Sequence, residues 1–258
     1  MRIGMLAAVM MVAGAAAAQT GGPCTLGINS YMGYGVTTKT GAPFSATMKE
    51  TFEQRLGDGN FIHGTTTSHE ARDSAGRTRM EMAQGCERGE DGQLQTQFTV
   101  NINDPTTKTT MTWQSDARRE KIVRVMHQQT IVPKQLTPEE QAERLKQQKV
   151  MQAAQPHQEF HSEKLGSRNI SGIMTEGVRT TTTVPAGEQG NDLPLVLVRE
   201  EWRSRELGII LMATNDDPRR GKTTFELEDI STSEPDPSLF TPPPGYKVED
   251  VHPQLEVH

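Results

Sequence analysis

The stretch Phe44-Ser-Ala-Thr-Met-Lys-Glu-Thr-Phe-Glu-Gln-Arg-Leu56 alternates apolar and polar side chains along most of its length. Phe44, Ala46, Met48 and Phe52 fall on one side of an extended chain, and the residues between them are mostly Ser, Thr, Lys and Glu. A period of two is typical of a β-strand with one buried face. The stretch therefore predicts a strand that begins at Phe44.

A turn follows this strand directly. Leu56-Gly-Asp-Gly-Asn60 contains the glycines that tight turns favour, and residues 61–73 can return as the antiparallel partner. Thr65, Thr66 and Thr67 suit an exposed sheet face, because β-branched residues lie well on a pleated surface. The sequence thus predicts an N-terminal β-hairpin.

The same pattern continues along the chain. Short turns such as Ser74-Ala-Gly-Arg77 separate further strands, which are predicted over residues 78–82, 94–102, 109–114, 121–127, 159–170, 172–184, 195–202, 207–214 and 222–230. Short connections favour antiparallel neighbours. We expect a mainly β fold in one domain over residues 44–250, with about ten strands.

One helix interrupts the strands. Thr137-Pro-Glu-Glu140 combines an N-cap residue, a proline at the first helical position and acidic residues in the first turn. The helix is predicted over residues 138–154, before Pro156. Its apolar residues are few, so it can bury only a narrow stripe.

Composition limits the classes of partner. The 258 residues carry 27 Lys and Arg against 33 Asp and Glu, a formal net charge of -6. This acidic balance lacks the basic footprint that nucleic acids require, so no nucleic acid is expected as a partner. We expect no integral membrane span, because no stretch of the chain reaches the length of one.

The N-terminus predicts export. Arg2, an apolar run from Ile3 to Val12 and the small residues Ala16 and Ala18 form the pattern of a signal peptide over residues 1–18. The protein is therefore expected in the periplasm or outside the cell. Residues 19–43, rich in Gly and Pro, are predicted to be a flexible lead-in, and residues 251–258 a frayed tail. Before this tail, a short helical turn is predicted to place Phe240 and Tyr246 against the sheet.

The predicted export bears on how the two cysteines are interpreted. Export favours a disulfide between Cys24 and Cys86, with two free thiols as the alternative. Cys24 could also carry a lipid, but Pro23 and the residues before it depart from the pattern that precedes a lipidated cysteine. Both alternatives stay open at this point.

The C-terminal half carries a resemblance. The motifs are Gly172-Ile-Met-Thr-Glu-Gly-Val-Arg179, Glu201-Trp202, Glu206-Leu-Gly208, Gly221-Lys-Thr-Thr224, Asp236-Pro-Ser-Leu-Phe240 and Pro244-Gly-Tyr246. In this order they resemble exported bacterial proteins, mostly of unknown function, with the LolA-like architecture of lipoprotein carriers. The resemblance implies a curved antiparallel sheet in the form of an incomplete β-barrel, whose concavity holds an acyl chain or a peptide. It also implies that the predicted helix acts as a lid.

Catalytic and metal sites are not predicted. His157 and His161 are four residues apart, but Pro156 precedes them and no third ligand is spaced to complete a site. No nucleophile elbow or phosphate-binding loop is present. We therefore expect neither an enzyme nor a cofactor.

A hydrophobic ligand is the favoured interpretation. Methionine is abundant, and flexible thioethers suit an adaptable apolar cavity, although they also fill irregular cores. The predicted ligand-binding residues are Met48, Phe52, Phe98, Met111, Trp113, Ile209 and Leu211. The expected function is non-enzymatic binding of a lipid or lipoprotein acyl chain. The alternative is a structural or interaction domain of the cell envelope, with a self-filled core and another envelope protein as its partner.

Overall fold

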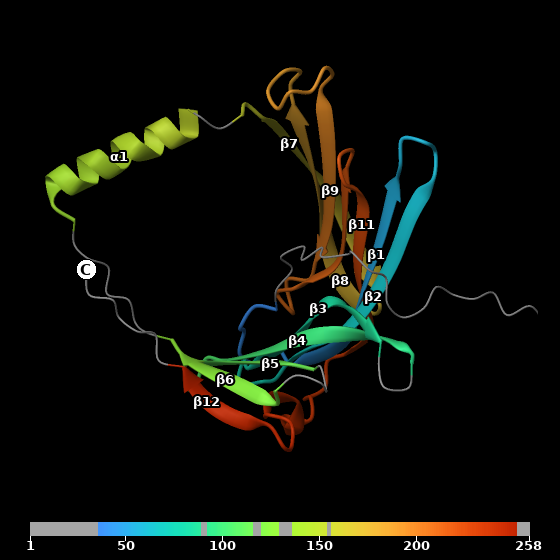
Figure 1. Ribbon diagram of the computed structural model, residues 1–258, viewed down its shortest axis with the longest axis vertical. Helices are drawn as coiled ribbons and strands as arrows, with labels where there is room; N and C mark the ends of the chain where they lie inside the picture. The colour runs from blue at the N-terminus through green and yellow to red at the C-terminus, as the bar shows by residue number, and fades with distance from the viewer. Residues whose placement is uncertain (1–35, 89–91, 116–119, 129–135, 154–155, 252–258) are drawn as a thin grey trace, which may run out of the picture.

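The computed structural model describes residues 36–88, 92–115, 120–128, 136–153 and 156–251 (Figure 1). The predicted signal peptide, Cys24 and most of the predicted lead-in and tail lie outside these residues. The elements in chain order are β1 (Phe44–Arg55), β2 (Phe61–Arg72), β3 (Thr78–Arg88), β4 (Leu94–Asp104), β5 (Thr109–Gln114), β6 (Ile122–His127), α1 (Pro138–Ala153), β7 (Glu159–Ile170), β8 (Ile173–Val184), β9 (Leu195–Arg203), β10 (Ile210–Asp217), β11 (Gly221–Ser231), the 3₁₀ turn η1 (Pro237–Phe240) and β12 (Lys247–Val251).

All the described strands belong to one open sheet. Their order is β12-β6-β5-β4-β3-β2-β1-β11-β10-β9-β8-β7, so β12 and β7 are the two edges. Neighbours are antiparallel, as predicted, except that β12 runs parallel to β6. The prediction of a mainly β fold with a curved antiparallel sheet and one helix is confirmed (Figure 1).

The register shows which residues share a face of the sheet, because directly opposed residues point to the same side. Met48 of β1 lies opposite Ser68 of β2 and Leu227 of β11. The predicted N-terminal hairpin is present. Thr66 differs from the prediction, since it is buried, whereas Thr65 and Thr67 are exposed. Strand alternation separates three consecutive threonines onto two faces.

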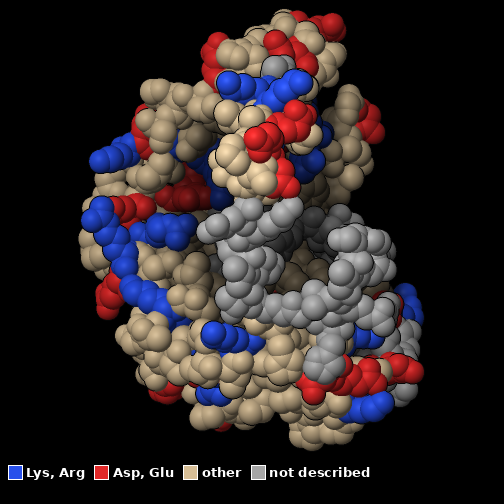
Figure 2. Space-filling model, turned by 90° about the vertical axis from the view of Figure 1, so that its left-hand side faces the viewer, with Lys and Arg blue, Asp and Glu red and all other residues tan. Residues whose placement is uncertain are grey.

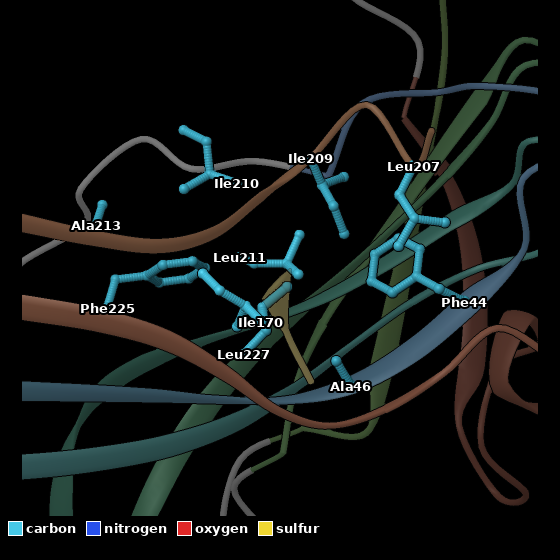
Figure 3. Close-up of a cluster of buried hydrophobic side chains, with 10 residues drawn as sticks. All are labelled: Phe44, Ala46, Ile170, Leu207, Ile209, Ile210, Leu211, Ala213, Phe225 and Leu227. Atoms are coloured by element: carbon cyan, nitrogen blue, oxygen red, sulfur yellow. The ribbon is translucent and has the colours of Figure 1, made fainter. Parts of the chain in front are cut away.

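One hydrophobic cluster shows the direction in which the sheet curls (Figure 3). Phe44 and Ala46 of β1 pack in it with Leu227 of β11 and with Ile170 of the edge strand β7. Four strands separate β1 from β7 in the sheet order. On a flat sheet these residues would be about 24 Å apart, given a strand spacing of about 4.8 Å. The sheet therefore curls toward this face, which we call the concave face, and we call the cluster the inner core.

A second cluster covers the opposite, convex face. Val100, Ile102 and Trp113 are buried there under Phe240 of η1. Tyr246 packs against the same cluster, and its hydroxyl donates a hydrogen bond to the carbonyl oxygen of Gln114 at 3.1 Å. The sequence prediction that the closing segment places Phe240 and Tyr246 against the sheet is confirmed. We call this cluster the outer core.

Hydrogen bonds connect residues 37–42, the end of the predicted flexible lead-in, to the sheet. The buried guanidinium of Arg72 donates hydrogen bonds to the carbonyl oxygens of Thr37, Ala42 and Leu207 at 2.6 to 2.9 Å. Gly41 also donates its backbone N–H to Ser74 at 2.9 Å. A buried cation needs acceptors, and this segment supplies them.

Helix α1 begins with the predicted cap. Glu140 donates its backbone N–H to Thr137 Oγ1 at 3.2 Å, and Glu140 Oε2 accepts from the backbone N–H of Thr137 at 2.8 Å. This reciprocal pair satisfies two backbone donors of the first turn. α1 lies apart from the sheet, on the side toward which the sheet is open (Figure 1). α1 is described to Ala153, and residue 154, the last of the predicted helix, lies outside the described residues.

Several strand ends differ from the predictions. β3 continues beyond Met82 to Arg88, and β10 runs to Asp217, where a turn was predicted from Asn215. Val251, predicted to fray, is the last residue of β12. Parallel pairing with β6 holds these closing residues: Val251 lies opposite Met126.

Candidate functional site: the concave face

The concave face carries exposed apolar side chains at both edges of the sheet. Phe160 of β7 and Val178 of β8 lie on it at one edge and are 71% and 39% exposed. Met126 of β6 and Val251 of β12 lie on it at the other edge and are 44% and 36% exposed. Exposed large apolar side chains are informative when they gather on one surface. Here both edges of the open sheet present them to the same space.

Helix α1 adds apolar side chains on the open side. Leu145, Val150 and Met151 are exposed, at 53%, 64% and 68%. A helix whose apolar residues were packed against the sheet would bury them. α1 therefore leaves its apolar surface available to another group.

The inner core fills the bottom of the concavity. Leu211, Ala213 and Leu227 are at most 1% exposed, and Figure 3 shows Leu211 and Leu227 next to Ile170 in the middle of the cluster. This part of the concavity is occupied by the protein's own side chains.

Strand β2 brings polar groups to the concave face. Ser68 and Glu70 are almost fully buried, and Ser68 Oγ and Glu70 Oε1 make no hydrogen bond within the described structure. Burial raises the pKa of Glu70 to about 8. Burial also lowers the pKa of Arg72, whose guanidinium lies 5.1 Å from the centre of the Phe44 ring. No sequence pattern indicates that these groups are buried, because the alternate residues of β2 contain no apolar side chain: they are Gly64, Thr66, Ser68, Glu70 and Arg72.

The structure brings four of the seven predicted ligand-binding residues together. Ile209 and Leu211 belong to the inner core, and Met48 packs against it. Phe52 is half-buried on the same face, opposite Gly64 and Thr223. All four residues lie on the concave face, and Phe52 alone lies outside the inner core and the residues packed against it.

The other three predicted residues lie on the convex face. Trp113 is buried in the outer core, and Met111 packs against that core. Phe98 is half-buried on the same side of β4 as Val100. The seven residues therefore line no single space, since the sheet separates the two groups. Their part in ligand binding stays a prediction.

The remaining sequence predictions concern other sites. Cys86 lies in β3, and its predicted partner Cys24 lies outside the described residues, so the disulfide stays a prediction. His161 is in β7, and His157 precedes that strand. Among the described residues, no three His, Cys, Asp or Glu side chains are grouped as a metal site.

The surface on the side of α1 has no dominant charge. Figure 2 shows basic and acidic side chains mixed over this face. No helix in the described ranges is both long enough and apolar enough to cross a membrane. The mixed charges offer no continuous basic surface for a polyanion on this face.

Comparisons with known proteins bear on the fold. No protein-family model and no curated protein matches the sequence. Among solved structures, MucB is similar at a TM-score of 0.32 and 12% identity, over 82% of this chain and 61% of that chain. The lipoprotein LppX of Mycobacterium tuberculosis gives a TM-score of 0.27 at 12% identity, over 75% of this chain and 88% of that one. A LolA superfamily protein from Nitrosomonas europaea gives 0.28 at 7% identity, over 78% and 90%.

The last of these neighbours is itself described as a LolA superfamily protein. The chain spans about three fifths of the MucB chain that it matches. At these identities and TM-scores the similarities carry no information on the ligand.

Proposed function

We propose that this protein binds the acyl chain of a lipid or lipoprotein on its concave face, and that it acts without catalysis. One observation carries the proposal: exposed apolar side chains stand on the concave face at both edges of the sheet. Phe160 and Val178 are at one edge, and Met126 and Val251 are at the other. Apolar groups at two separated edges suit an elongated apolar ligand better than a compact one.

The energy of such an interaction comes from apolar area removed from water. Each buried methylene of an acyl chain contributes about 0.8 kcal/mol. Met126 and the α1 residue Met151 supply flexible thioethers that adapt to ligands of different length. A chain of ten or more methylenes therefore offers enough favourable free energy to offset the cost of association.

The competing function is a structural or interaction domain without a ligand. The inner core favours this alternative at the bottom of the concavity, because Leu211 and Leu227 already fill it. The edge residues do not favour this alternative, because nothing in the described structure covers Phe160, which is 71% exposed. Binding measurements on variants of the edge separate the two functions.

The test uses palmitate and a lysophospholipid as probes, with affinities measured by isothermal titration calorimetry. The variant Phe160→Ser/Met126→Ser removes one apolar side chain from each edge. Val248→Ser is the matched control, because Val248 is 53% exposed but lies on the convex face opposite Val123. We expect the double variant to weaken binding at least tenfold and the control to leave it unchanged.

Two results would contradict the proposal. The first is equal affinity of the wild type, the double variant and the control, which would place binding elsewhere. The second is no measurable affinity for either probe, with native mass spectrometry of protein from its own host showing a bare chain. The interaction-domain function would then be favoured.

The proposal includes the localisation of the protein. Residues 1–18 direct export to the periplasm or beyond, and Cys24 then pairs with Cys86. Secretion in the native host, followed by intact mass measurement without reductant, tests both. We expect a chain that begins at Gln19 and whose mass is lower by two hydrogens than that of the reduced form. A chain that retains Met1, or two thiols that react with iodoacetamide, would refute the corresponding part.

A further inference from the structure

The sheet is held together at its middle by a short junction between β2 and β3. These strands have twelve and eleven residues, but among the described residues they pair only between Glu70–Arg72 and Thr78–Met80. On their other sides, β2 pairs with β1 along its whole length, and β3 pairs with β4 from Thr78 to Arg88. Figure 1 shows β1 and β2 leading away from the junction in one direction, and β3 and β4 in another.

The junction divides the sheet into two halves, each with its own hydrophobic cluster. The seven-strand half contains β7, β8, β9, β10, β11, β1 and β2, and the five-strand half contains β3, β4, β5, β6 and β12. The inner core lies within the seven-strand half and the segments that join its strands. The buried residues of the outer core belong to the five-strand half and η1, except for Ala71 of β2. Two bodies with separate cores can each stay rigid while the connection between them bends.

The buried polar groups of the junction do not join the two halves. Glu70 and Arg72 are 3% and 0% exposed, and Glu70 Oε1 makes no hydrogen bond within the described structure. The Arg72 guanidinium donates to the carbonyl oxygens of Thr37, Ala42 and Leu207, which all lie outside the five-strand half. A buried polar atom without a partner costs free energy. Regions with few stabilising contacts open more easily than the cores beside them.

The apolar edges of the concave face belong to different halves. Phe160 and Val178 are in the seven-strand half, and Met126 and Val251 are in the five-strand half. β12 lies four strands from β3, so a rotation of about 10° at the junction moves that edge by about 3 Å, given a strand spacing of about 4.8 Å. Apolar contacts extend over only about 4 to 4.5 Å, so this displacement decides whether one ligand touches both edges.

We propose that the junction between β2 and β3 is a hinge, about which the two halves move to adjust the concave face to its ligand. This inference rests on the proposed binding of an acyl chain. Without a ligand, the two halves take a range of angles. A chain in contact with both edges favours one angle, because a ligand shifts an equilibrium toward the conformation that it binds more tightly. Closure of two rigid bodies about a few residues at the ends of elements is a common form of such motion.

The test measures distances between two spin labels by double electron–electron resonance on the full chain. Labels on the unnatural residue p-acetylphenylalanine leave both cysteines unmodified. The inter-half pair is Val196 of β9 and Val248 of β12, which are exposed on the convex face, away from the proposed ligand. The control pair is Val196 and Thr67 of β2, because both belong to the seven-strand half and Thr67 is also exposed on the convex face.

Without a ligand, we expect the distance distribution of the inter-half pair to be at least twice as wide as that of the control pair. Palmitate should narrow the inter-half distribution and leave the control distribution unchanged. Met80→Gly weakens the junction, because glycine weakens a strand, and should widen the inter-half distribution further. Met82→Gly is the matched control, since Met82 lies on the same face of β3 but opposite Thr99 of β4, and no described residue of β2 pairs with it.

Equal widths for the two label pairs without a ligand, or equal effects of Met80→Gly and Met82→Gly, would overturn the hinge. Palmitate that binds in calorimetry but leaves the inter-half distribution unchanged would overturn the coupling of the hinge to the ligand. A wide inter-half distribution in a protein without measurable affinity for palmitate would support the hinge and contradict the acyl-chain function. Failure of the hinge and failure of the proposed function are thus distinguishable.

Discussion

Burial of Glu70 makes the stability of the protein depend on pH in a direction opposite to that of most carboxyl groups. In the unfolded chain Glu70 loses its proton near its ordinary pKa of 4.5, whereas in the folded protein it keeps the proton until about pH 8. Unfolding therefore releases a proton between these two values. The free energy of unfolding must fall as pH rises through this range.

The magnitude follows from the two pKa values. A one-unit difference in pKa corresponds to about 1.4 kcal/mol, so this carboxyl group costs up to roughly 5 kcal/mol of stability at pH 8 relative to pH 4.5. Glu70→Gln keeps the shape and the buried polar group but removes the ionisation. The advantage of the variant over the wild type should therefore grow by about 1.4 kcal/mol per pH unit between about pH 5 and pH 8.

The assay is urea unfolding of both proteins at pH 5, 6, 7 and 8, without any ligand. Contributions from other titrating groups cancel in the difference between the two proteins, because these groups are the same in both. A difference in unfolding free energy that stays constant across the four pH values would refute the reasoning. It would mean that water reaches the Glu70 carboxyl group in the folded protein.

Three further predictions concern stability, each measured by urea unfolding at pH 5. Arg72→Lys keeps the positive charge but loses the forked guanidinium group that contacts three carbonyl oxygens. The free energy of unfolding should fall by about 2 to 4 kcal/mol. A loss below about 1 kcal/mol would show that Lys reaches the same acceptors. Gly221→Ala should lower the free energy of unfolding by about 3 kcal/mol or more, because φ is +95° and the added carbon would collide with the Glu53 carbonyl oxygen. In the control Gly57→Ala, the added carbon meets nothing within 4 Å, so this change should be nearly neutral. Phe240→Ala should cost about 3 to 5 kcal/mol, since Phe240 is buried in the outer core; a small loss would indicate that η1 is not needed to cover the convex face.

Local patterns predicted the local structure well. The alternation from Phe44 onward predicted β1, and Thr137-Pro138 predicted the start of α1, because each pattern depends only on neighbours along the chain. The burial of Phe240 by the closing segment also followed from the sequence. These features need no knowledge of how distant strands are paired.

The candidate site was only partly predictable for the opposite reason. Alternation assigns Met48 and Phe52 to one side of their own strand, and Met111 and Trp113 to one side of theirs. Strand register decides which face of β1 is continuous with which face of β5. The sequence of either strand alone does not specify that register. The seven predicted ligand-binding residues therefore include residues from both faces of the sheet.

Buried polar residues were missed altogether. Glu70 and Arg72 have the side chains that surfaces normally carry, so a pattern of apolar residues cannot reveal that β2 places them inside. The edge residues Phe160 and Met126 were missed for different reasons: Phe160 is an isolated apolar residue in a mostly polar stretch of β7, and Met126 stands next to the end of the short strand β6. These two residues face the same space only because the sheet is curled.

The parallel pairing of β12 with β6 has a consequence for how the chain folds as it is made. β6 gains its outer partner only when Lys247 reaches Ile122, and β12 follows every other described strand in the sequence. Until then β6 presents an unpaired edge, the kind of surface on which strands of other molecules add and aggregate. Contacts so distant along the chain also form slowly. The chain therefore depends on protection of this edge between its synthesis and the arrival of β12, and a holdase chaperone that shields nascent strands would supply it.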